Sequence, residues 1–292
     1  MIEQVMGGGV VKEDFQAGLA MLAQPVLPLV SMVHFLYITG PFTTVAEVIE
    51  EMPEPIETGY ALYEYPRKQL RQYTQHLMLL EGLKNTTETD LQIVDANGNQ
   101  LDHTTALTSF INQQIMADEL EAINSALCSP CGCTLCCTGP DDGMAHEFFE
   151  IPLQADETAL FDLPRFDTPA SQTRSAMDDP PLQMADKPFY DMADPGLFHW
   201  QTGWSIILPR KAACPALGRK GRCGVYTTRP RVCRKPQIFC YIIESLQGSD
   251  RLRLRNCLLA ITDCPYVQIL GDEIAVYAAA CELELLFKGN KQ

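Results

Sequence analysis

Cysteine spacing is the feature that most constrains this 292-residue chain. Five of its twelve cysteines fall in one run, Cys128-Ser-Pro-Cys131-Gly-Cys133-Thr-Leu-Cys136-Cys137. Two residues between cysteines allow both thiolates to reach one ion while the backbone turns around it. The same spacing serves iron–sulfur clusters. One such pair is a weak signal, because a redox pair has it too, but a dense run of this kind indicates a metal site.

A second group, Cys214, Cys223 and Cys233, follows about eighty residues later. We expect the two groups to meet, with sulfur-to-sulfur distances of about 4–7 Å. The adjacent pair in the first group favours two metal centres or one polynuclear centre, because neighbouring side chains of an extended chain point to opposite faces. Cysteines can also be inert, buried apolar residues, and that is the expectation for the isolated Cys240, Cys257 and Cys281.

The first residues lack a basic stretch followed by an apolar run, so we expect a cytoplasmic, reducing location, where clustered cysteines favour metal or redox chemistry over disulfides. The most apolar segment, Val26–Ile38, is too short to span a bilayer and contains Pro28. It is expected to be a buried core helix, and no membrane partner is predicted.

The charge of the chain is strongly uneven. A net charge of -15 argues against nucleic acid as a partner. Residues 209–256, the basic window, nevertheless carry twelve basic and two acidic side chains. This local positive field predicts either a protein or anionic small-molecule partner there, or simply a solvated face.

Periodicity predicts an α+β fold with two parts. Residues 1–125 contain no cysteine and are expected to form a mainly helical domain of unknown role. Residues 126–292 are expected to form a cysteine-cluster domain with few short strands. The elements predicted are helices over Val45–Met52, from Pro66 onward, over 108–127 and over Asp272–Phe287; a hairpin over Leu91–Leu101; strands over Phe148–Leu153 and Trp204–Leu208; and a long ordered excursion over Leu163–Gly203.

The run from Cys214-Pro215 through Arg229-Pro230 to Cys233-Arg234 closely resembles the second half of the CxxCxxCC (YkgJ-type) family, described as a zinc- or iron-chelating domain with eight characteristic cysteines. The resemblance covers about the last 165 residues. It departs from the family in one place, because Pro130 stands where the first cysteine is expected, and Cys131 or Cys128 must substitute. The ligands implied by the resemblance are Cys131, Cys133, Cys136, Cys137, Cys214, Cys223, Cys233 and Cys264, with Cys128 in reserve.

Arg229 and Arg234, with Tyr226, lie beside these cysteines in sequence and are candidates to surround the centre. Arginine side chains would offset the negative charge of metal-bound thiolates and donate hydrogen bonds to sulfur. The alternative, given equal weight, is that these arginines belong to an ordinary basic surface exposed to solvent.

The function expected is metal binding, by an iron–sulfur cluster or by Zn²⁺, with the downstream activity unassigned. The family includes flagellin lysine methylases that contain this domain, so a protein-modifying enzyme is one alternative. A structural zinc module or a metal carrier that mediates protein interaction is the other. Catalytic residues are not identified.

Overall fold

The computed structural model describes residues 12–84, 91–218, 221–246 and 250–289. Helices and strands are mixed, which confirms the α+β class. The contacts divide the chain into two units, one made of residues up to Cys131 together with those from Gln237 onward, and one made of residues 132–236. This division differs from the expected 1–125 and 126–292, because strands near the C-terminal end pair and pack with the N-terminal part.

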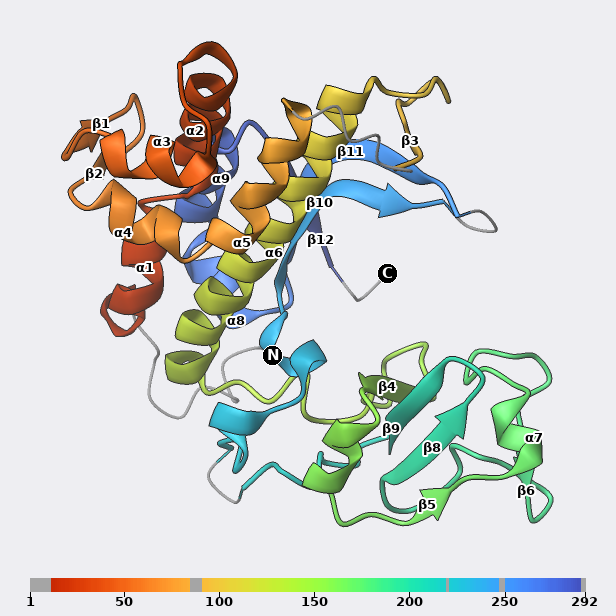
Figure 1. The fold of residues 1–292 in the computed structure, drawn as a ribbon. Helices are drawn as coiled ribbons and strands as arrows, with labels where there is room; N and C mark the ends of the chain where they lie inside the picture. The colour runs from red at the N-terminus through yellow and green to blue at the C-terminus, as the bar shows by residue number, and fades with distance from the viewer. Residues whose placement is uncertain (1–11, 85–90, 219–220, 247–249, 290–292) are drawn as a thin grey trace. The chain divides into compact units, whose positions relative to one another are not determined.

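The first unit combines ten helical segments with a mixed sheet among the described residues (Figure 1). The helical segments are η1 Lys12–Phe15, α1 Gln16–Leu22, α2 Leu27–Thr39, α3 Val45–Glu51, α4 Pro66–Arg71, α5 Thr74–Leu77, η2 Met78–Leu83, α6 His103–Cys131, α8 Pro265–Ile269 and α9 Gly271–Ala280. The strands are β1 Ile56–Glu57, β2 Leu62–Tyr63, β3 Ile93–Val94, β10 Ile238–Ser245, β11 Leu252–Ile261 and β12 Glu284–Lys288. In the larger sheet β11 is central: β10 pairs with it antiparallel, and β12 and β3 pair with it parallel.

The long helix α6 is the centre of this unit. Ile111, Ile115 and Ile123 are fully buried along one side of it, with the spacing that an amphipathic helix requires. The helix is longer than the predicted 108–127 and runs from His103 to Cys131. Pro130 is tolerated in the last turn. The helix ends at Cys131, and the next residue, Gly132, has a φ of 62°, which glycine adopts without strain.

Polar side chains join α6 to the elements that follow the second unit. Asn124 on α6 is buried, and its Nδ2 donates to the Ile238 carbonyl at 2.9 Å. Its Oδ1 accepts from the Gln237 N–H at 3.0 Å and from the Tyr266 hydroxyl at 2.8 Å. One side chain therefore fixes both the start of β10 and α8 against α6.

The second unit is built on an antiparallel sheet of order β4-β9-β8 with β5 added parallel to β8. Its elements are β4 Phe148–Leu153, η3 Asp156–Leu160, β5 Arg165–Phe166, α7 Pro169–Gln172, β6 Gln183–Met184, β7 Lys187–Pro188, β8 Gly196–Trp200, β9 Gly203–Pro209, η4 Tyr226–Thr228 and η5 Arg231–Arg234. Alternation along β9 sends Ile206 and Leu208 to one apolar cluster and Ile207 to another, so both faces of the sheet are covered.

The predicted strands over 148–153 and 204–208 are confirmed as β4 and β9, and Val26–Ile38 is confirmed as a core helix, α2. Asp272–Phe287 is only partly helical, since α9 ends at Ala280 and residues 284–288 form β12. The part from residue 126 onward also holds longer strands than expected, β10 and β11 above all.

By length and composition, Lys12–Thr39 is long and apolar enough to cross a membrane, with 39% of its apolar window buried inside the protein. Core helices of soluble proteins pass the same test, and Leu29, Val30 and Val33 of α2 lie in the core.

Candidate metal centre

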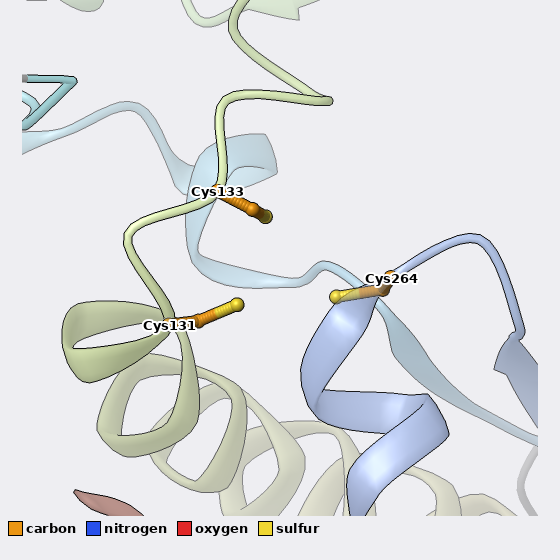
Figure 2. Close-up of side chains that lie close together, drawn as sticks. All are labelled: Cys131, Cys133 and Cys264. Atoms are coloured by element: carbon orange, nitrogen blue, oxygen red, sulfur yellow. The ribbon is translucent and has the colours of Figure 1, made fainter. Parts of the chain in front are cut away.

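Three of the predicted ligands come together at the end of α6. The sulfur atoms of Cys131, Cys133 and Cys264 all lie within 4.8 Å of one another. Figure 2 shows Cys131 on the last turn of the helix, Cys133 just beyond it and Cys264 at the start of α8, with the side chains pointing toward a common space. Cys131 and Cys264 are buried and Cys133 is half-buried.

Local backbone chemistry explains why these three converge. The left-handed Gly132 turns the chain sharply between Cys131 and Cys133. Cys264 is the residue before α8, and Pro265 occupies the first helical position, where its fixed φ and missing N–H are favourable. The hydrogen bond from Tyr266 to Asn124 holds α8, and with it Cys264, against α6.

Cys128 lies on α6 three residues before Cys131, so the two side chains share a face of the helix. It is half-buried. Burial raises the pKa of Tyr266, and the charges of Cys264, Cys128 and Cys131 raise it further. Cys128 is thus within electrostatic range of the same tyrosine as two of the three convergent cysteines, and it remains the reserve ligand.

The spacing of the three sulfurs sets the size of what they can hold. Zinc–sulfur bonds in a tetrahedral site place the sulfurs about 3.8 Å apart. The observed limit of 4.8 Å suits a single ion.

The remaining predicted ligands belong to the second unit. There the chain after Cys136 runs beside the chain before Cys214: the Cys214 N–H donates to the Cys137 carbonyl at 2.7 Å, and Thr138 bridges to Ala213. The two cysteine-bearing segments therefore meet through their backbones. The sulfur-to-sulfur distances expected between them stay a prediction.

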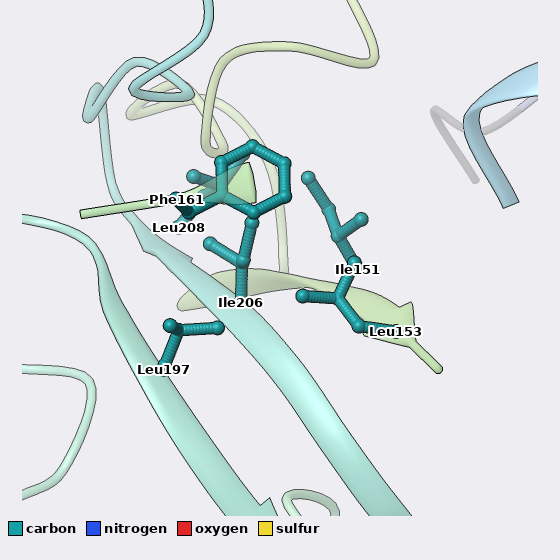
Figure 3. Close-up of a cluster of buried hydrophobic side chains, with 6 residues drawn as sticks. All are labelled: Ile151, Leu153, Phe161, Leu197, Ile206 and Leu208. Carbon is teal, nitrogen blue, oxygen red and sulfur yellow. The ribbon is translucent and has the colours of Figure 1, made fainter. Parts of the chain in front are cut away.

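Cys223 and Cys233 reach the same region by two turns. A bridge between Leu217 and Cys223 folds the chain back toward Cys214, and the Cys233 N–H donates to the Pro230 carbonyl at 2.9 Å in η5. Cys214 and Cys233 both pack against the buried cluster of Ile151, Leu153, Phe161, Leu197, Ile206 and Leu208 (Figure 3).

The thiols of this second set influence one another. Burial, followed by the charges of Cys136, Cys214 and Cys223, raises the pKa of Cys233 to about 12. Burial likewise raises the pKa of Cys214, with contributions from Cys223 and Cys136. A hydrogen bond with Cys137 is the largest cause that raises the pKa of Cys136.

Arg229 is a buried cation whose charge acts on two cysteines of this set. It is 5% exposed, and its guanidinium lies over the ring of Tyr226 at 3.9 Å from the centroid. Its charge lowers the pKa of both Cys136 and Cys233, against the larger causes that raise them. Arg234 is placed differently, because its Nε donates to the Arg229 carbonyl at 3.0 Å and so supports the backbone.

Other predicted features are distributed elsewhere. Cys240, Cys257 and Cys281 are buried in the first unit, as expected of inert cysteines. The basic window is divided between the two units, and in the first unit Arg253 and Arg255 both pair with Glu244. Sequence reasoning missed Asn124 and Tyr266, since a single polar residue within a helix carries no signal of what it will contact.

Searches against family models, curated proteins and solved structures find no match to this chain. The resemblance to the CxxCxxCC family therefore stays a prediction, and the site must be interpreted from its own geometry.

Proposed function

We propose that this protein binds one zinc ion through Cys131, Cys133 and Cys264, with Cys128 as the fourth ligand. The observation that carries the proposal is the mutual approach of the three sulfurs to within 4.8 Å. Thiolates are ligands that zinc prefers, and four of them around one ion make a closed site with no position for substrate. Each thiol would release its proton to solvent on binding.

The role of such an ion would be structural. It would cross-link the last turn of α6 to the start of α8, beside the Asn124–Tyr266 hydrogen bond that already joins them. The first unit has its own apolar core, so we expect the metal-free chain to stay folded and to loosen mainly around Cys128–Cys133 and Cys264. A carrier would instead give up its metal readily to a competing chelator.

The test compares Cys264→Ser with Cys281→Ser, a matched change at a buried cysteine outside the site. After dialysis against a weak chelator, elemental analysis should find about one equivalent of zinc fewer in Cys264→Ser than in the wild type, because a serine hydroxyl is a poor ligand for zinc. Cys281→Ser should keep the full zinc content. In the same assay Cys128→Ser should hold zinc more weakly than the wild type.

Circular dichroism checks that each variant remains folded. Equal zinc content in Cys264→Ser and the wild type would contradict the proposal. If Cys128→Ser binds zinc as tightly as the wild type, Cys128 is not a ligand. The proposal of a site formed by Cys131, Cys133 and Cys264 would not be affected.

A further inference from the structure

We propose that the first unit binds a neutral amphiphile, a straight aliphatic chain with a hydroxyl or amide head, in an open cavity between α2 and α6. The cavity has a volume of about 940 Å³, which lies in the range of small-molecule sites in proteins. It lies wholly within the first unit and shares no lining residue with the proposed zinc site. The inference therefore does not rest on the proposed function.

Segments from both ends of the chain form the walls of this cavity. One side of α2 and the first half of α6 form two walls, and the β1–β2 hairpin, β10, β11 and the turn after α9 form the others. Apolar side chains predominate in the lining, among them Leu27, Leu36, Ile56, Ile242, Leu254 and Leu283. These side chains are aliphatic, so they favour an aliphatic chain, because binding would remove apolar surface of both partners from water.

The helix α2 is apolar on two opposite sides. Leu29 and Val33 are fully buried in the core on one side, whereas Met32 and Leu36 line the cavity on the other. Phe35 also lines the cavity and is 65% exposed. A helix at the surface of a protein normally has a single apolar side. The second apolar side of α2 therefore indicates a ligand that covers it.

Hydrogen-bonding groups on α6 determine the head group of that ligand. Thr105, Ser109 and Asn112 line the cavity at helical spacing. The Asn112 Oδ1 is shielded from water and accepts no hydrogen bond from any residue that the structure describes. Such an acceptor is unfavourable unless a donor reaches it. The terminal torsion of asparagine is soft, so the amide can turn this oxygen toward a hydroxyl or N–H donor of a ligand.

The charge of the lining excludes an anionic head. Glu282 is the one charged residue in it, and no lysine or arginine lines the cavity in the described part of the chain. A carboxylate or phosphate would leave water without meeting a cation, and Glu282 would repel it. A neutral donor is therefore the head that this lining fits.

Calorimetry with the full chain tests the chemistry of the ligand, with 1-hexanol, 1-octanol and 1-decanol as probes. One equivalent should bind, and the affinity should rise about fourfold for each added methylene, as expected when a chain enters an apolar site. Decanoate should bind more weakly than 1-decanol, and decylamine no more tightly. No binding, or an affinity that does not depend on chain length, would overturn the proposal. Tighter binding of decanoate or decylamine would overturn the neutral head.

A variant that fills the cavity tests the place of binding. Met32→Trp puts a larger side chain into the wall at a half-buried position, and Ile38→Trp is the control on the same helix, since Ile38 is exposed and does not line the cavity. Met32→Trp should weaken binding of 1-decanol at least tenfold, and Ile38→Trp should match the wild type. Circular dichroism checks folding, and Ser31→Trp, at an exposed lining position, replaces Met32→Trp if that variant does not fold. Wild-type affinity in a folded Met32→Trp or Ser31→Trp variant would place the ligand elsewhere and overturn the site.

The role of Asn112 is tested by comparing 1-decanol with its methyl ether, which has the same chain and no hydroxyl donor. The wild type should prefer the alcohol about tenfold, because the hydroxyl supplies the donor that Oδ1 lacks. Asn112→Leu should bind the two probes equally and keep the dependence on chain length. A preference for the alcohol that persists in Asn112→Leu would overturn Asn112 as the acceptor of the head group.

Discussion

Glu119 is the most unusual single residue outside the cysteine sets. It is 3% exposed on α6, and its two oxygens have separate partners. Oε1 accepts from the Val26 N–H at 2.9 Å, and Oε2 lies 2.6 Å from the Tyr277 hydroxyl. Burial raises the pKa of this carboxyl to about 7, against the opposing effect of both hydrogen bonds.

This raised pKa predicts a pH-dependent stability. Between pH 4.5 and about 7 the unfolded chain releases the Glu119 proton while the folded chain keeps it. The free energy of unfolding should therefore fall as pH rises through that window, by about 3 kcal/mol in total, and level off above it. Glu119→Gln should remove this dependence and be more stable than the wild type at pH 8, because the amide resembles the neutral acid.

Urea unfolding of both proteins from pH 4 to pH 8 measures the effect, and the difference between the two curves removes the contribution of every other group. Parallel curves would show that Glu119 titrates alike in the folded and unfolded chains.

At this scale the sequence predicted the kind of site and not its geometry. The dense cysteine run indicated metal and contains Cys131 and Cys133, whereas Cys264 was implied only by the family resemblance. The resemblance left Cys128 and Cys131 as alternatives, because Pro130 stands where the family has its first cysteine. Which sulfurs converge depends on Gly132 and on the Asn124–Tyr266 hydrogen bond, and a long-range contact of that kind has no local signature.

At the scale of the element, the start of the helix α3 is determined by side chains next to it in the sequence. The Thr44 hydroxyl accepts from the Glu47 N–H at 3.3 Å, and the Glu47 carboxylate accepts from the Thr44 N–H at 3.3 Å. This capping box fixes the first turn, and the predicted start at Val45 is confirmed.

Thr44→Ala should lower the free energy of unfolding by about 1 kcal/mol, because it leaves a helical N–H without its cap. Thr39→Ala is the control, since the Thr39 hydroxyl donates only to the Phe35 carbonyl within α2. Urea unfolding monitored by circular dichroism compares the two variants with the wild type. A loss no greater than that of Thr39→Ala would show that the cap contributes nothing in this context.

Elements that depend on distant partners were harder to predict. The helix expected over Asp272–Phe287 stops at Ala280, where Glu282 adopts a φ of 56° and the Leu283 N–H bonds back to the Ala278 carbonyl. Glycine or asparagine is the usual residue in this left-handed conformation at a helix end. A glutamate at position 282 therefore did not indicate that the helix would end here. The residues beyond it become β12 because β11 offers a parallel edge.

The whole chain folds with one unit interrupted by the other. Gln113 on α6 bridges to β10, where its Oε1 accepts from the Ile242 N–H at 2.8 Å and its Nε2 donates to the Cys240 carbonyl at 3.1 Å. The Leu252 N–H of β11 donates to the Gln92 carbonyl at 2.9 Å beside β3. Residues from both ends of the chain therefore build one core. Local sequence patterns do not predict such long-range contacts.

This arrangement predicts that the N-terminal part does not fold alone. A chain of residues 1–131 lacks β10 and β11, which pack on α6 and pair with β3, so its apolar stripe would be left in water. A second chain, in which a linker joins residue 131 directly to residue 237, keeps β10 and β11 and should form the complete first unit. The linker must return along α6 from Cys131 to Asn124, about 10 Å, and eight glycine and serine residues span about 16 Å on average.

We expect the joined chain to unfold cooperatively in urea, with the helical circular dichroism of a folded unit, and the 1–131 chain to show a shallow transition. The physical reason is that α6 packs on the returning strand β10, and that apolar burial is the main source of folding free energy. Both chains carry the same helix-forming sequence up to Cys131, so propensity alone predicts equal behaviour. Equally steep unfolding transitions in the joined chain and the 1–131 chain would contradict this prediction. They would mean that residues 1–131 form a complete core and that β10 and β11 are not needed for its cooperative folding.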